Sequence, residues 1–277
     1  MDYIQSLGAL FSKKDVRDYR IDCVSAPAEF PAEFELEMPK VKSQGSVGSC
    51  VAHSISTVIE YFNNLQQNNN EEMSVGYIYG NRTNTAYTKS GMYTRDAIAV
   101  TCKYGDVPKA LFPYNEEVPD IIEKFNNQSD ELFSKGQPNR FTSYYRLYTE
   151  DEIKTSLMNN GPVIFAMQWY DDIKVIDGVI TTSQKTDNGG HCMVLYGWNE
   201  QGWKIQNSWG KHWGKGGRAI LPYNVKIREA WGIIDTLTQT ETNVVKPYNG
   251  KVGNMFAKIL NLLINIGYEL IAILKRR

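Results

Sequence analysis

The chain lacks an excess of charge of either sign. Its 277 residues carry a net charge of −1, with 30 Lys and Arg against 31 Asp and Glu. A balance this close to zero excludes the broad basic field with which nucleic-acid-binding domains attract phosphates. Hydrophobic residues make up 42% of the chain, which is enough for the core of one large domain or of two compact lobes.

Cysteine and histidine are scarce, so each candidate catalytic side chain can be weighed singly. The chain has three histidines and four cysteines, which are Cys23, Cys50, Cys102 and Cys192. If one cysteine is a nucleophile, three remain, and an odd number argues against a disulfide framework. The N-terminus has no basic region ahead of a long apolar stretch, so no signal peptide is evident. Both features indicate a reducing, cytoplasmic location.

Cys50 ends the glycine-containing segment QGSVGSC, which begins at Gln44. The glycines at 45 and 48 allow a tight turn, and apolar residues spaced near four from Val51 onward predict a helix over about 50–65. A cysteine in the first turn of a helix lies near unpaired N–H groups and the positive end of the helix dipole, which favour the thiolate. On this segment alone, a nucleophile and a small buried apolar residue are equally good readings.

Two later segments favour the nucleophile. His191 follows two glycines at the head of a strand-like run, and Asn207 lies in the segment QNSWG. They follow Cys50 by about 140 and about 157 residues, close to the spacing of papain-type enzymes. The three segments, in this order, resemble the papain-like cysteine peptidases, and the resemblance covers roughly residues 30–234.

Further segments resemble the compact bacterial and viral, xylellain-like branch of that family. They are residues 15–19, 90–97, 105–108 and 112–114. Val47 and Val51 stand where the family commonly has Cys and an aromatic residue, so Val47 removes a usual disulfide without changing the chemistry. Fewer than about 30 residues precede the family's usual start, too few for an independently folded inhibitor domain.

The resemblance implies a role for each matching residue. Cys50 is the expected nucleophile and His191 its acid–base partner. Asn207 is expected to accept a hydrogen bond from one ring nitrogen of His191, and Trp209 to cover that bond from water. Gln44 and the Cys50 backbone N–H are expected to stabilise the tetrahedral oxygen.

Substrate binding and cofactors are also implied by the resemblance. Ser90 and Gly91 are expected to bind the substrate backbone as an added strand, Gly190 to line the second subsite, and Trp209 to border the site. No metal or organic cofactor is implied, and the expected partner is a peptide or protein substrate. Of the other histidines, we expect His53 to pack in the core and His212 to be solvated.

The pattern along the chain is helical first and then strand-like, which predicts an α+β fold. Expected helices cover about 73–82, 94–104, 118–135 and 150–159, and expected strands cover 163–167, 179–180, 191–198, 203–206 and 218–221. The resemblance sharpens this to a papain-like fold in which a helical lobe faces a twisted barrel-like lobe across a cleft. We divide the chain into an N-terminal arm over 1–26, a peptidase domain over 27–240, a linker over 241–253 and a C-terminal helix over 254–277.

Two segments outside the catalytic motifs leave alternatives open. One reading of the arm over 1–26 is a short inhibitory pro-segment that lies across the cleft. The helix over 254–277 is strongly apolar with one polar stripe, and it reaches roughly 30 Å. It would serve as a membrane-surface anchor, as a protein-binding or self-association helix, or as a helix packed on the catalytic domain.

We therefore expect a cysteine endopeptidase that works through a Cys50–His191 acyl-enzyme. The alternative from another class is a structural or targeting protein on a peptidase scaffold, with the C-terminal helix as its working part. A third hypothesis is acyl transfer to an amine, which the same pair of side chains supports.

Overall fold

The structure is a computed structural model that describes residues 7–15, 18, 29–85, 89–114 and 130–235. Contacts divide the chain into one unit over 1–237 and a second over 238–277. The linker and helix that the sequence predicts over 241–253 and 254–277 lie outside the described residues, as does Cys23. No helix among the described residues is long and apolar enough to cross a bilayer.

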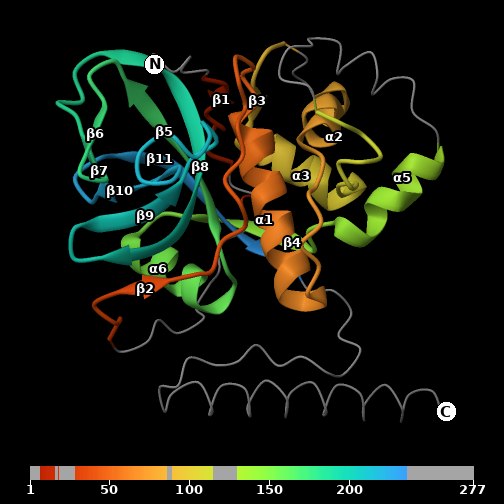
Figure 1. Ribbon diagram of the computed structural model, residues 1–277, viewed down its shortest axis with the longest axis horizontal. Coiled ribbons are helices and arrows are strands. Elements are labelled where there is room, and N and C mark those ends of the chain that lie inside the picture. The colour runs from red at the N-terminus through yellow and green to blue at the C-terminus, as the bar shows by residue number, and fades with distance from the viewer. Residues whose placement is uncertain (1–6, 16–17, 19–28, 86–88, 115–129, 236–277) are drawn as a thin grey trace. The chain divides into compact units, whose positions relative to one another are not determined.

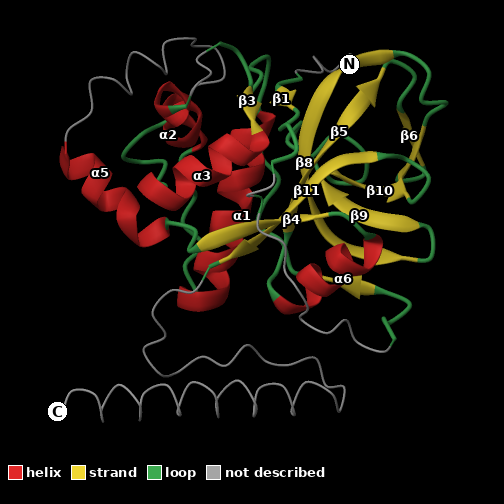
Figure 2. Ribbon diagram, turned by 180° about the vertical axis from the view of Figure 1, so that it is seen from behind, coloured by secondary structure: helices red, strands yellow, loops and turns green. Residues whose placement is uncertain are grey.

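Most of the helices gather on one side of the described domain, and the main sheet forms the other side (Figure 1). The helices are α1 (Cys50–Gln67), α2 (Val75–Gly80), α3 (Thr94–Tyr104), α5 (Asp130–Gly136) and α6 (Glu150–Asn159), with 3₁₀ turns η1 (Asn81–Asn84) and η2 (Gln137–Asn139). Helix α6 lies apart from the others, against the sheet (Figure 2). Its start is fixed by a capping box between Thr149 and Glu152.

The helix expected over 73–82 begins later than the sequence predicts, and the one expected over 118–135 is described only in part. Helix α2 starts at Val75 because the Ser74 side chain accepts a hydrogen bond from the Tyr77 N–H and so caps the helix there. It ends at Gly80, and the expected remainder to residue 82 is a 3₁₀ turn. Helix α5 begins at Asp130, and residues 118–129 of the expected helix lie outside the described part of the chain.

The strands of the second half form an open, mixed sheet. They are β4 (Ser143–Leu147), β5 (Val163–Tyr170), β6 (Lys174–Ile176), β7 (Val179–Thr181), β8 (Asp187–Asn199), β9 (Gly202–Gln206), β10 (Arg218–Pro222) and β11 (Ile227–Ile234). Among the described strands the order is β4-β11-β5-β8-β9-β10-β7-β6, and β2 (Phe34–Glu35) also pairs with β8. The predicted α+β class is confirmed, with a curved open sheet in place of a closed barrel.

Helix α1 joins the two sides because it packs against β8 and is buried from Cys50 to Asn63. One apolar cluster lies around α1, α2 and α3, and a second fills the space between the sheet and α6. Since polar side chains inside a core need partners, Glu60 pairs with Lys42 at 2.7 Å and accepts from the Met73 N–H. The packing therefore fixes where the first residue of α1 meets the middle strand of the sheet.

Candidate active site

Cys50 is the first residue of α1 and is fully buried at the junction with β8. The loop before it turns at Gly45, whose φ of 55° suits glycine. Cys50 and Cys192, which lies on β8, belong to the same buried apolar cluster, and α1 packs against β8. Because Cys192 directly follows His191, the fold brings the sulfur from the first part of the chain next to the strand that carries the imidazole.

His191 is fixed by the side chain that the sequence predicts for this role. Its Nε2–H donates to Asn207 Oδ1 at 2.8 Å, and the same oxygen accepts from the Ser208 N–H at 2.7 Å. Because a carbonyl oxygen only accepts, Nε2 carries the proton, and Nδ1 keeps its lone pair. Nδ1 forms no hydrogen bond with any described residue, and so none with Cys50.

The position of His191 along its strand differs from the prediction. The histidine is the fifth residue of β8 rather than its head, and it pairs with Met167 of β5. The strand extends back to Asp187 because Gly189 and Gly190 pair with the end of β5. His191 is therefore held in register by β5, and α1 packs against the same strand.

Two tryptophans enclose the His191 ring. Trp209 stacks on it with ring centroids 4.5 Å apart and planes at 28°. Trp169 contacts both rings edge-on: its ring centroid lies 5.2 Å from that of the imidazole and 4.8 Å from that of Trp209. The sequence predicts the covering role of Trp209 and misses Trp169, although Trp169 stands on the same face of β5 as Met167, two residues earlier.

Gln44 is fully buried, and hydrogen bonds of its backbone and of its side chain orient it. Its N–H donates to the Ser208 carbonyl at 2.8 Å, and its Oε1 accepts from the Ser208 hydroxyl at 2.6 Å. Its Nε2 donates to the Val47 carbonyl at 2.9 Å. Since the carboxamide oxygen is taken by Ser208, the amide nitrogen must face the loop that leads to Cys50.

Residues 7–12 of the N-terminal arm cover these groups. The Gly8 N–H donates to the Gly190 carbonyl at 3.2 Å, and the Gly8 carbonyl accepts from the Met92 N–H at 2.9 Å. The arm strand β1 (Ala9–Leu10) then runs parallel to β3 (Met92–Tyr93).

Gly91 (φ 86°) approaches the arm closely, because a Cβ on it would stand 2.6 Å from the Gly8 oxygen. A Cβ on Gly190 would stand 2.0 Å from the Ala9 oxygen. The arm thus lies on the residues predicted to bind substrate.

The fourth residue predicted for this role is Ser90, which precedes Gly91 and is itself exposed. Its hydroxyl oxygen lies 3.1 Å from where a Cβ on Gly48 would stand. Ser90 and Gly91 therefore border the same gap between the α1 loop and β3, through which the arm passes.

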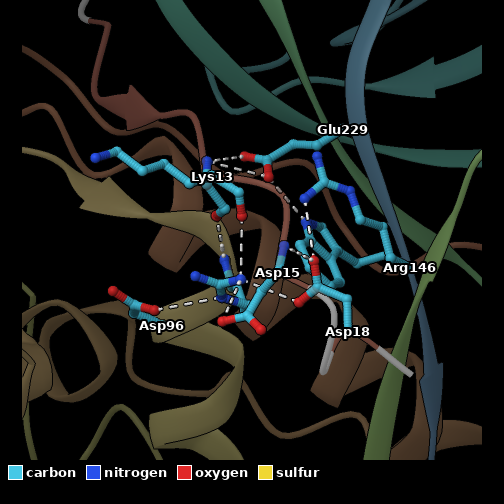
Figure 3. A network of polar contacts seen from close by, with 9 residues as sticks. Lys13, Asp15, Asp18, Asp96, Arg146 and Glu229 are labelled. Atoms are coloured by element: carbon cyan, nitrogen blue, oxygen red, sulfur yellow. Dashed lines mark hydrogen bonds and ion pairs between the residues drawn. The ribbon is translucent and has the colours of Figure 1, made fainter. Parts of the chain in front are cut away.

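Ionic contacts fasten the arm beyond β1 (Figure 3). The Asp18 carboxylate is almost fully buried and accepts from Arg95 Nη1 at 3.0 Å and from Arg146 Nη1 at 3.3 Å. The Ser12 N–H lies 3.3 Å from both carboxylate oxygens of Glu229. Because removing one partner of a buried charged pair leaves the other unpaired at a high cost, Asp18 is the main ionic anchor of the arm.

Burial under the arm makes both members of the candidate dyad neutral. It raises the pKa of the Cys50 thiol to about 11, and backbone hydrogen bonds from Cys192 and Gly8 lower it less. Burial also lowers the pKa of His191 to about 4, against a smaller rise from its bond to Asn207. The expectation that the helix start favours a thiolate is therefore wrong for this arm-covered state, because desolvation outweighs the dipole.

The other two histidines differ in their surroundings. His212 is exposed, as expected. His53 is buried in α1, but both of its ring nitrogens lie within hydrogen-bond distance of backbone carbonyls, so it is more than a packing residue. Cys50, Cys102 and Cys192 are free thiols, and no group of His, Cys, Asp or Glu among the described residues is arranged to hold a metal ion.

Comparison with known proteins agrees with this geometry. The family model described as "Papain family cysteine protease" matches residues 27–237. A cysteine protease of Blomia tropicalis is 27% identical in an alignment of 217 positions that covers 70% of this chain and 60% of that protein. A peptidase C1-like protein of Acanthamoeba polyphaga mimivirus is 25% identical over 77% of this chain and 76% of its own length.

A solved structure shares the fold over most of the described chain. The crystal structure of xylellain, a cysteine protease from Xylella fastidiosa, matches with a TM-score of 0.71 and 25% identity. The match covers 85% of this chain and 98% of xylellain. The papain-like fold predicted from the sequence is therefore confirmed.

Proposed function

The chain belongs to the papain family of cysteine proteases, and from that premise we propose that it is an endopeptidase in which Cys50 and His191 form and break an acyl-enzyme. The observation that carries the proposal is the position of the thiol. It stands at the start of α1, which packs against the strand that carries His191, while His191 itself is oriented by Asn207 with Nδ1 unpartnered among the described residues. A base needs both an oriented ring and a free nitrogen.

Acylation begins with transfer of the Cys50 proton to His191 Nδ1. The sulfur then attacks the carbonyl carbon of the scissile peptide, and the carbonyl oxygen becomes negatively charged. The Cys50 N–H and Gln44 Nε2 stabilise that oxygen, and a donor of this kind contributes about 3–4 kcal/mol. The carbon–nitrogen bond breaks as His191 returns its proton to the leaving amine, which leaves a thioester on Cys50.

Deacylation uses the same groups in the reverse roles. His191 takes a proton from water as the water oxygen attacks the thioester carbon. The second tetrahedral oxygen occupies the same position between Cys50 N–H and Gln44. Its collapse breaks the carbon–sulfur bond, releases the carboxylic acid and returns the proton to sulfur. Trp209 and Trp169 keep the His191–Asn207 bond away from water, which strengthens it.

The arm is proposed to hold the enzyme latent. It is poorly placed for cleavage at Gly8, because the Gly8 carbonyl oxygen is taken by the Met92 N–H. It also keeps both reactive groups buried and neutral. Displacing the arm would expose the gap beside Ser90 and Gly91 to a substrate strand and return water to the dyad.

Covalent labelling tests the catalytic assignment. We expect an epoxide or vinyl-sulfone peptide probe to modify Cys50 once the arm is displaced, and Cys50→Ala to abolish both labelling and peptide hydrolysis. Peptide mapping separates Cys50 from Cys192, the neighbouring buried thiol, which serves as an internal control. Modification of Cys192 with an untouched Cys50 would reject the proposal. Products formed with an added amine separate hydrolysis from acyl transfer.

A further inference from the structure

His53 joins the two segments that supply the oxyanion donors. Its ring is 1% exposed and lies on α1, three residues after Cys50. Nδ1 is 3.0 Å from the Ser49 carbonyl and 3.2 Å from the Ser49 hydroxyl, while Nε2 is 3.2 Å from the Ser43 carbonyl. Ser43 directly precedes Gln44, and Ser49 directly precedes Cys50. The ring therefore spans the two ends of the loop between the proposed donors.

The contacts define how the proton is placed. Burial lowers the pKa of His53 to about 3, so the ring is neutral and has one N–H. Both ring nitrogens face a backbone carbonyl, but the Ser49 carbonyl already accepts from the His53 backbone N–H at 3.0 Å. With the proton on Nε2, the ring donates to the Ser43 carbonyl and Nδ1 accepts from the Ser49 hydroxyl, so both nitrogens have a partner. The Tyr114 hydroxyl lies 2.8 Å from the Ser49 hydroxyl and 3.2 Å from the Gln44 carbonyl, and it supplies the next donor. In this arrangement each hydrogen has an acceptor.

We propose that His53, supported by Tyr114, is a positioning residue that fixes the distance between Gln44 and the Cys50 N–H and so preorganises the oxyanion pocket. The inference rests on the proposed function and assigns it a further residue. Oxyanion donors act because they stand in place before the charge develops. A loop with two glycines does not by itself provide that rigidity, and the His53 bridge does.

A packing role alone does not account for these contacts. A phenylalanine would fill similar space and keep the edge-on contact with Tyr114, whose ring centroid is 5.2 Å from that of His53. It would, however, leave the Ser43 carbonyl and the buried Ser49 hydroxyl without this partner. His53→Phe therefore removes the bridge while it keeps the volume, and His53→Gln restores a donor for the Ser43 carbonyl.

Two small reagents in the full-length protein isolate the oxyanion step. Acetylation of Cys50 by p-nitrophenyl acetate passes through a tetrahedral oxyanion, whereas alkylation by iodoacetamide displaces iodide without one. Movement of the arm changes the access of both reagents to Cys50. The ratio of their rate constants therefore measures how well the pocket stabilises the oxyanion. Thr57→Val, a buried change one turn further along α1, is the matched control. Thermal unfolding of each variant establishes that it is folded.

We expect His53→Phe to lower the acetylation-to-alkylation ratio by about 10- to 100-fold, less than complete removal of an oxyanion donor. His53→Gln should recover much of the ratio, Tyr114→Phe should lower it mildly, and Thr57→Val should not move it. An unchanged ratio in folded His53→Phe would overturn the inference, as would equal losses of both rates or a His53→Gln variant no better than His53→Phe. A wild-type Cys50 that reacts with neither reagent would instead reject the proposed function.

Discussion

The two sides of the candidate site are built by different forces. On the helical side, Cys50 and Gln44 are fixed by hydrogen bonds to Ser208, Val47 and the His53 bridge. On the sheet side, one hydrogen bond to Asn207 orients His191, and tryptophan rings pack around it. Removal of a single polar atom is enough to break a hydrogen bond and the orientation it provides. The stabilisation from ring packing, by contrast, depends on the volume that the side chain fills. The two sides should therefore respond differently to substitution.

The largest loss of peptide hydrolysis is expected when the thiol or the imidazole is removed. Cys50→Ala and His191→Ala should each lower peptide hydrolysis by at least about 10⁴-fold, because the remaining groups supply only oxyanion binding and substrate binding. Hydrolysis of a fluorogenic peptide and thermal unfolding measure the loss and the fold. If His53→Ala, and not His191→Ala, removed activity, the base would lie on the helical side.

A change of volume tests the sheet side. Trp209→Ala should destabilise the protein by about 3–5 kcal/mol, because a large buried ring is replaced by a cavity next to His191. Chemical denaturation measures the change. Ser208→Ala in the same loop is the polar counterpart, and we expect it to affect the acetylation-to-alkylation ratio more than stability. A Trp209→Ala variant that kept wild-type stability would contradict the comparison.

The pH dependence distinguishes the two buried histidines. His191 has a pKa of about 4 under the arm and an ordinary pKa near 6.5 when solvated, so the covered state binds fewer protons between these values. Acidification from pH 6.5 to 4 should therefore favour displacement of the arm, by up to about 3 kcal/mol. Hydrogen exchange of residues 7–12, corrected for its intrinsic pH dependence, measures the opening.

Substitution separates the contribution of His191 from that of His53. We expect His191→Gln to remove most of this acid-linked opening and His53→Gln to preserve it, because only His191 lies under the arm. Equal acid sensitivity in wild type and His191→Gln would show that other groups control the arm.

The smallest effect concerns the anchor of the arm. Asp18→Asn should weaken arm binding by roughly 2 kcal/mol, since it removes the charge facing Arg95 and Arg146 but keeps a hydrogen-bonding oxygen. Probe labelling of Cys50 should then become faster. Asp15→Asn is the matched control, because Asp15 is more exposed and lies 3.9 Å from Arg95. Equal acceleration by both substitutions would show that general charge, rather than the buried pair, retains the arm.

The sequence predicted much of the fold and the main residues of the site. Periodicity placed α1, α3 and α6 and the central strands, because their apolar faces are long and regular. The structure places Cys50 at the start of α1, His191 on β8 and Asn207 directly after β9, with Asn207 bonded to His191. The catalytic roles that the spacing of these residues predicts stay a prediction. The strands β4 and β11 were missed, since their pattern of burial depends on partners far along the chain.

Other features depend on three-dimensional contacts that a sequence does not display. The bridge formed by His53 requires Ser43 and Ser49 to approach from either end of a loop. Burial raises the pKa of the Cys50 thiol to about 11, and that burial depends on the tertiary packing around it, which no local pattern near Cys50 encodes. The arm itself was one of several readings, because residues 7–12 carry no motif of their own.

The passage of the arm between Gly48, Gly91 and Gly190 has a consequence for how latency is tuned. The backbone of Gly8 lies against the backbone of Gly48, so a Cβ added to Gly8 would stand 2.0 Å from the Gly48 oxygen. Backbone atoms cannot yield as a flexible side chain does, so one methyl group at position 8 is enough to unseat the whole segment. If the arm holds the enzyme latent as proposed, a side chain at position 8 would favour the active form through steric clash, a route separate from the ionic contacts of Asp18.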